Sequence, residues 1–171
     1  MTDTPTLESK DKFFRRKSTL NCRGKILSLD TPLVMGILNV TPDSFYAGSR
    51  LSSLDDVLHR TEAMLRDGAD ILDLGGYSSR PGAADVTVAE ELDRVIPAVK
   101  AIIQAFPDAV ISVDTFRAEV AEASIEAGAS IINDISGGNL DEAMHETVAR
   151  LQVPYILMHM RGTPQTMQSE T

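Results

Sequence analysis

The fold is decided by the stretch Leu33-Val-Met-Gly-Ile-Leu38, an apolar run that leads directly into the polar segment Asn39-Val-Thr-Pro-Asp-Ser-Phe45. The run does not alternate with polar residues, which is typical of a parallel strand covered on both faces. Three later apolar runs also end at polar signatures, which are Gly75–Gly82, Asp114-Thr115 and Asn133-Asp134. Because the carboxyl ends of parallel strands converge on one face, we expect these signatures to line one small-ligand pocket.

Strand-like and helix-like patterns alternate along the chain. The apolar runs predict strands at residues 33–38, 70–74, 110–113, 130–132 and 155–158, and helical periodicity predicts helices at about 53–67, 88–105, 117–127 and 140–151. This alternation predicts an α/β fold, a partial TIM (β/α)8 barrel with about five parallel strands and four helices. Since a complete barrel usually takes roughly 250 residues, we expect this 171-residue chain to be the N-terminal part of one.

The N-terminal region divides into two parts. Residues 1–17 are polar and mixed in charge, which predicts a loose leader. Two short strand-like runs then flank Arg23-Gly24, a two-residue connection typical of a β-hairpin. We therefore expect residues 18–171 to be one barrel domain that begins with this hairpin.

Composition excludes several classes of protein. The formal net charge of −9 argues against nucleic acid as a partner, and no apolar run is long enough to cross a membrane. The N-terminus lacks the apolar segment of a signal peptide, so we expect a cytoplasmic protein. With one cysteine and three scattered histidines, neither a disulfide nor a zinc hydrolase site is expected.

The second signature has the chemistry of an anion site. Gly75 and Gly76 allow backbone amides to approach a ligand, Ser79 donates a hydroxyl, and the guanidinium of Arg80 can fork onto a phosphate. The alternative interpretation is a glycine-rich surface turn with an exposed arginine. The segment matches neither the Walker P-loop nor the dinucleotide-binding pattern.

Three other polar residues are candidate ligand contacts. Asp114 and Asn133 each end a predicted strand, and a carboxylate beside an amide can read the edge of a planar heterocycle such as a pterin or a purine. Asn39 can offer its carbonyl oxygen to a hard cation or its amide to a phosphate. The alternatives are a helix N-cap for Asp114, a loop amide for Asn133 and a structural turn around Asn39. Asp73, just inside a strand, is interpreted as a satisfied structural carboxylate.

These segments, in this order, resemble the dihydropteroate synthases, folate-pathway enzymes of the pterin-binding barrel family. The resemblance rests on four strings, Gly36-Ile-Leu-Asn-Val-Thr-Pro-Asp-Ser-Phe45, Ser78-Ser-Arg-Pro-Gly82, Ser112-Val-Asp-Thr115 and Met158-His-Met-Arg-Gly162. It implies condensation of 6-hydroxymethyl-7,8-dihydropterin diphosphate with 4-aminobenzoate to give 7,8-dihydropteroate and diphosphate.

The resemblance also implies roles for individual residues. Asp114 and Asn133 would hydrogen-bond the pterin, Asn39 would bind Mg2+ near the diphosphate, and Ser79 with Arg80 would contact the anion. No residue is implied as a protein nucleophile. A homodimer is implied for the full-length protein, while the 171-residue fragment alone is expected to be inactive because later family segments lie beyond Thr171.

The sequence departs from the family pattern in the first two loops. Tyr46 and Ala47 follow Phe45 where the family often has an acid, and Ser79 stands where threonine is usual. Two alternative functions stay open, a methyltetrahydrofolate:corrinoid methyltransferase and a non-catalytic pterin-binding remnant.

Overall fold

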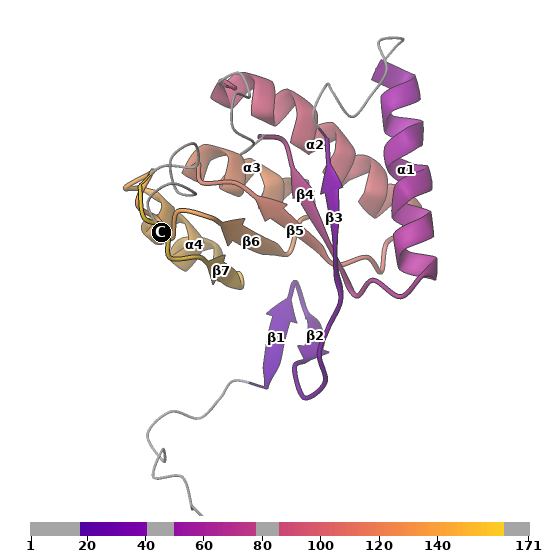
Figure 1. Ribbon diagram of the computed structural model, residues 1–171, viewed down its shortest axis with the longest axis horizontal. Helices are drawn as coiled ribbons and strands as arrows, with labels where there is room; N and C mark the ends of the chain where they lie inside the picture. The colour runs from indigo at the N-terminus through magenta and orange to yellow at the C-terminus, as the bar shows by residue number, and fades with distance from the viewer. Residues whose placement is uncertain (1–17, 41–49, 78–85, 163–171) are drawn as a thin grey trace, which may run out of the picture.

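The apolar runs of the sequence form one parallel sheet (Figure 1). The computed structural model describes residues 18–40, 50–77 and 86–162, with only the backbone for 50–53, so the predicted leader 1–17 lies outside the described residues. The strands are β3 (Met35–Asn39), β4 (Ile71–Gly75), β5 (Ile111–Asp114), β6 (Ile131–Asp134) and β7 (Tyr155–Leu157). They pair in sequence order, and all four pairings are parallel. The predicted parallel arrangement is confirmed, with each strand boundary within two residues of its expected place.

In the described part of the chain, four helices alternate with these strands and lie on one side of the sheet (Figure 1). They are α1 (Arg50–Arg66), α2 (Val88–Ala105), α3 (Ala118–Ala127) and α4 (Met144–Leu151). Neighbouring helices contact each other in chain order, and α2 packs on β4. The helix α2 begins with a capping box, in which Thr87 accepts a hydrogen bond from the Glu90 backbone and Glu90 accepts one from the Thr87 backbone. The sheet and the layer of helices on its one side therefore form part of an α/β barrel.

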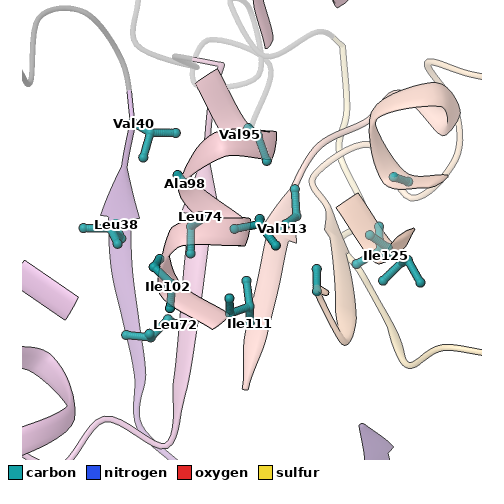
Figure 2. Close-up of a cluster of buried hydrophobic side chains, with 14 of the residues drawn as sticks. Leu38, Val40, Leu72, Leu74, Val95, Ala98, Ile102, Ile111, Val113 and Ile125 are labelled. Atoms are coloured by element: carbon teal, nitrogen blue, oxygen red, sulfur yellow. The ribbon is translucent and has the colours of Figure 1, made fainter. Parts of the chain in front are cut away.

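The main core fills the space between the sheet and the helices. Leu38, Leu74 and Val113 project from β3, β4 and β5 toward α2, where Figure 2 shows Val95 and Ile102 facing them. All five side chains are fully buried. Burial of each contributes roughly 1.5–3 kcal/mol. This face of the strands is fixed by hydrophobic packing, which leaves alternate residues to face the other side.

The β-hairpin covers the amino ends of the strands on that other side. It consists of β1 (Thr19–Cys22) and β2 (Lys25–Ser28), joined by Arg23 and Gly24 with φ of 54° and 89°. Its apolar residues Cys22, Leu20 and Leu27 pack on a second cluster formed by Ile71, Val110 and Ile131. The predicted hairpin is confirmed. Toward the carboxyl ends the same face is open, since Ile37 on β3 is 64% exposed.

The fourth helix begins later than the sequence indicated. The pattern predicted a helix from residue 140, but α4 begins at Met144. The intervening residues instead make turns, in which the Leu140 N–H donates to the Ser136 hydroxyl at 3.3 Å and the Ala143 N–H donates to Asp141 Oδ1 at 3.0 Å. Asp141 in addition accepts a hydrogen bond from the Ala118 backbone at 2.7 Å. The backbone N–H groups of Leu140 and Ala143 are therefore satisfied by side chains without a helix.

Gly76 is expected to be sensitive to substitution because α2 passes close to it. A Cβ built on Gly76 lies 2.6 Å from Val95 Cγ2 and 3.2 Å from Glu91 Cγ. Valine is restricted at χ1 and cannot swing away. We expect Gly76→Ala to lower the free energy of unfolding by about 1–3 kcal/mol in urea denaturation.

The matched control is Gly36→Ala on β3. There the new methyl group would meet Met64 Sδ at 3.1 Å, which is part of a flexible side chain. We expect this substitution to change the free energy of unfolding by less than about 1 kcal/mol. Equal losses in both variants would show that packing of α2 on β4 does not require glycine.

Candidate functional site

Three of the predicted site residues lie in one row across the sheet. Asn39 pairs in register with Gly75, Gly75 with Asp114, and Asp114 with Asn133. Residues in register on neighbouring parallel strands project to the same face. The row therefore stands at the carboxyl edge of four strands, on the face away from the helices. Residues Ser79 and Arg80, the other two, lie outside the described residues.

Gly75 leaves a gap between two polar side chains of this row. A Cβ built on Gly75 would lie 3.4 Å from Asn39 Oδ1 and 3.8 Å from Asp114 Oδ2. The side chains of Asn39 and Asp114 thus flank the position from which a larger residue would project. Since glycine places no atoms there, a ligand can reach both polar groups from above the sheet.

Beneath this row lies a buried carboxylate. Asp73 precedes Gly75 by two residues on β4 and so projects to the same face. Asn133 Nδ2 donates a hydrogen bond to Asp73 Oδ2 at 3.0 Å. The other oxygen, Oδ1, is buried and has no hydrogen-bond partner among the described residues. The interpretation of Asp73 as a fully satisfied structural carboxylate is therefore wrong for one of its two oxygens.

The electrostatic surroundings of Asp114 are acidic. Burial, and to a smaller extent the charges of the nearby acids Asp73, Glu91 and Asp134, together raise the pKa of Asp114 from its usual 3.8 to about 7. The guanidinium of Arg117 is paired with Glu91, with Nη1 and Oε2 2.6 Å apart. The carboxyl group of Asp114 can therefore change its protonation near neutral pH, which is common at functional sites.

Asp114 is not the N-cap of the helix that follows it. The helix α3 begins at Ala118 with Arg117 as its N-cap, and the backbone N–H of Ala118 donates to Asp141 Oδ2. The alternative structural role proposed for Asp114 from the sequence is thus wrong. Asp141, distant in sequence, supplies the cap instead.

Asp134 holds the loop after β6 in place. Its Oδ1 accepts hydrogen bonds from the backbone N–H and the hydroxyl of Ser136, at 2.7 and 2.8 Å. Its Oδ2 accepts from the Gly138 N–H at 2.8 Å and the Tyr155 hydroxyl at 2.6 Å. Asp134 is fully buried, and these four bonds satisfy both carboxylate oxygens. Because Asp134 is adjacent to Asn133, this network also fixes the strand end that carries the Asn133 amide.

Arg117 joins the two described residues that flank the segment 78–85. Its Nη2 donates to the Val86 carbonyl oxygen at 2.5 Å, and its guanidinium carbon lies 5.4 Å from the centre of the Tyr77 ring. The ring of Phe116 meets the Tyr77 ring edge to face, with centroids 5.1 Å apart. Cation–π and aromatic contacts of this kind contribute about 0.5–1.5 kcal/mol each.

The described part of the chain contains no cluster of three or more histidine, cysteine, aspartate or glutamate side chains that could hold a metal ion. Within the same residues, no helix is both long and apolar enough to cross a membrane.

Comparison with known sequences finds a family and several similar proteins. The profile of the family described as "Pterin binding enzyme" matches residues 35–171. The dihydropteroate synthase of Escherichia coli strain K12 is 51% identical over 149 residues, which are 87% of this chain and 52% of that protein. The folic acid synthesis protein fol1 of Pneumocystis carinii is 51% identical over 138 residues, 81% of this chain and 18% of that protein. The chain thus spans about half the length of the bacterial relative and less of the fungal one.

Solved structures give the same result. A dihydropteroate synthase from Xanthomonas albilineans with 4-aminobenzoic acid has a TM-score of 0.78 and 44% identity, over 85% of this chain and 54% of that one. The same kind of enzyme from that organism in complex with 7,8-dihydropteroate has a TM-score of 0.74 and 41% identity, over 84% and 51% of the two chains. A dihydropteroate synthase of Yersinia pestis with a sulfonamide drug complex has a TM-score of 0.78 and 48% identity, over 88% and 54%.

The raised pKa of Asp114 predicts a specific pH dependence of stability. A carboxyl group whose pKa is higher in the folded state stabilises the fold below its unfolded pKa, and this contribution is lost as the pH rises toward and through about 7. We expect Asp114→Asn, which cannot ionise, to be more stable than wild type by roughly 1–3 kcal/mol at pH 8. The difference should shrink as the pH approaches 4. Urea denaturation between pH 5 and 8 measures it, and parallel curves for the two proteins would contradict the prediction.

Proposed function

Because the chain belongs to the family of pterin binding enzymes, we propose that the protein that carries it is a dihydropteroate synthase. The reaction joins 6-hydroxymethyl-7,8-dihydropterin diphosphate to 4-aminobenzoate and releases diphosphate, giving 7,8-dihydropteroate. The single observation that carries this proposal is the row of Asn39, Asp114 and Asn133 at the carboxyl edge of the sheet. Names of similar proteins agree with it, since they refer to dihydropteroate synthases and folate synthesis.

The polar groups of the row suit a flat heterocycle. A pterin ring carries hydrogen-bond donors and acceptors along its edge, and it needs groups that can satisfy both when it leaves water. Asp114 offers carboxyl oxygens, while Asn133 offers a carbonyl oxygen and N–H groups. Their strands are adjacent and in register. We propose that these two side chains hold the pterin in a fixed orientation above the sheet.

The chemistry requires positioning more than a reactive protein group. The amine nitrogen of 4-aminobenzoate forms a bond to the pterin methylene carbon, the bond from that carbon to the diphosphate oxygen breaks, and the amine loses a proton. Positive character develops on the methylene as the diphosphate leaves. Residues that hold the two reactants in line lower the barrier by removing the entropic cost of their encounter. We propose that Ser79 and Arg80 provide donors to the departing diphosphate.

The residues at the edge fit a Mg2+ ion bound mainly by the substrate. Mg2+ commonly takes one or two protein oxygen ligands and completes its shell with phosphate oxygens and water. Asn39 supplies a carbonyl oxygen beside the gap at Gly75, 3.4 Å from where a Cβ would stand. When bound, the ion would neutralise charge on the leaving diphosphate. Asn39 is proposed as its protein ligand.

The proposal also covers the cellular location and the oligomeric state of the protein. We propose a cytoplasmic location for the complete protein and, as the family resemblance implies, a homodimer. Sedimentation of the complete protein would test the oligomeric state, and a monomer at micromolar concentration would contradict the homodimer.

The proposed activity is tested directly with isotope-labelled 4-aminobenzoate. Binding of a pterin without formation of labelled 7,8-dihydropteroate would favour a non-catalytic pterin-binding protein instead.

Removal of the Asp114 carboxyl group should weaken pterin binding. We expect Asp114→Ala to raise the Kd for 6-hydroxymethylpterin by roughly 10- to 100-fold, because ring donors are left unpaired at about 1–3 kcal/mol. Isothermal titration calorimetry measures this change. Asp56→Ala, which removes an exposed carboxylate on α1, is the matched control and should leave the Kd unchanged. An unaltered Kd in Asp114→Ala would reject the role of Asp114.

The anion subsite should be separable from the pterin subsite. We expect Arg80→Ala and Asn39→Ala to weaken binding of the diphosphate-bearing pterin by about 10-fold or more, with less than a 3-fold effect on the free pterin. In Asn39→Ala the affinity for the diphosphate ligand should also lose its dependence on Mg2+. Calorimetry with and without Mg2+ measures both effects. Equal losses for the two ligands would contradict the assignment of these residues to the diphosphate.

A further inference from the structure

We propose that Asp73 is a positioning residue that fixes the order of donor and acceptor atoms which Asn133 presents to the pterin ring. This inference rests on the proposed function. It starts from a hydrogen bond between two side chains that links the ligand-facing row to the layer beneath it, in which Asn133 Nδ2 donates to Asp73 Oδ2 at 3.0 Å.

The hydrogen bond allows one orientation of the Asn133 amide. An asparagine side chain has an NH2 group and a carbonyl oxygen of nearly the same shape, so an unrestrained amide can turn over at little steric cost. A carboxylate oxygen accepts hydrogen bonds and does not donate them. Turning the amide over would place its Oδ1 against Asp73 Oδ2, so two acceptors would face each other. The Asp73 carboxylate therefore holds the NH2 group of Asn133 toward itself and leaves the Oδ1 atom of Asn133 available to a ligand.

The burial of Asp73 supports a role beyond packing. Its side chain is only 6% exposed, in a strand that is buried along its whole length. Its second oxygen has no hydrogen-bond partner among the described residues, and neither does the hydroxyl of Ser112, its register neighbour on β5. A buried oxygen without a hydrogen-bond partner destabilises the folded state. A carboxylate kept only for the fold would be expected to use both oxygens, as Asp134 does.

Fixing the amide has a direct consequence for recognition. Asn133 presents an acceptor, Oδ1, and its second N–H as a donor, in a constant order beside the carboxyl group of Asp114. A planar ring matches this order in one orientation and opposes it when turned over about its long axis. The orientation of the ring decides where the methylene carbon lies. Asp73 would thus act through Asn133 on the position of the reacting atom without touching the ligand.

A double-mutant cycle tests this role in the protein that carries the chain. We expect Asp73→Ala to raise the Kd for 6-hydroxymethylpterin about 10-fold when Asn133 is present. In an Asn133→Ala background the same change should alter the Kd less than 2-fold, because the amide it orients is gone. Asp73→Asn keeps one carbonyl acceptor and should lose less affinity than Asp73→Ala. Ser112→Ala, a buried polar neighbour in the same layer, should change the Kd less than 2-fold.

The outcomes separate this inference from the function on which it rests. If the wild type binds the pterin and Asn133→Ala weakens binding, but the effects of Asp73→Ala and Asn133→Ala simply add, the positioning role is wrong. If the wild type does not bind the pterin, both the function and the inference are overturned. If Asp73→Ala is too unstable to titrate, the cycle is run with Asp73→Asn, and an affinity loss that persists in the Asn133→Ala background rejects the inference.

Discussion

The register of the parallel strands is the constraint on which the site depends. Three pairings, between β3 and β4, β4 and β5, and β5 and β6, place Asn39, Gly75, Asp114 and Asn133 side by side. A slip of one residue in any strand would turn its polar residue toward the helices. What prevents the slip is the packing of alternate residues, such as Leu38, on the opposite face. The hydrophobic core and the candidate site are therefore two faces of the same arrangement.

Much of the fold could be predicted from the sequence because its signals are local. Each strand is a short apolar run that ends at a polar residue, and the strand boundaries fall within two residues of expectation. The start of α4 could not be predicted in this way. Just before this helix, Asp141 accepts hydrogen bonds from the backbone of Ala143 and from that of Ala118, which is 23 positions away in the sequence. Helical periodicity carries no information about such a contact, so the turns before Met144 were assigned to the helix.

In the candidate site, too, contacts between residues distant in sequence could not be predicted. Asn39, Asp114 and Asn133 could be singled out because each ends a predicted strand, and the structure brings them together. Asp73 could be predicted only as a structural carboxylate, because it lies inside a strand and its partner Asn133 is 60 residues away. The available signal was a carboxylate within the otherwise apolar run Ile71-Leu72-Asp73-Leu74. A charged residue in a fully buried strand is costly, and that cost is itself a reason to look for a function.

The distribution of charge around the row bears on how a ligand would be oriented. Asp73, Glu91 and Asp134 surround Asp114, and the nearby Arg117 is already paired with Glu91. Such surroundings favour the donor-bearing edge of a neutral ring and disfavour phosphate oxygens. In the proposed function, the ring of a pterin diphosphate would therefore lie against the acids. Its diphosphate would lie away from them, near hydrogen-bond donors elsewhere at the carboxyl edge of the sheet. Repulsion from the acids and hydrogen bonding by the amide of Asn133 would then select the same orientation, so that specificity would come from both attractive and unfavourable contacts.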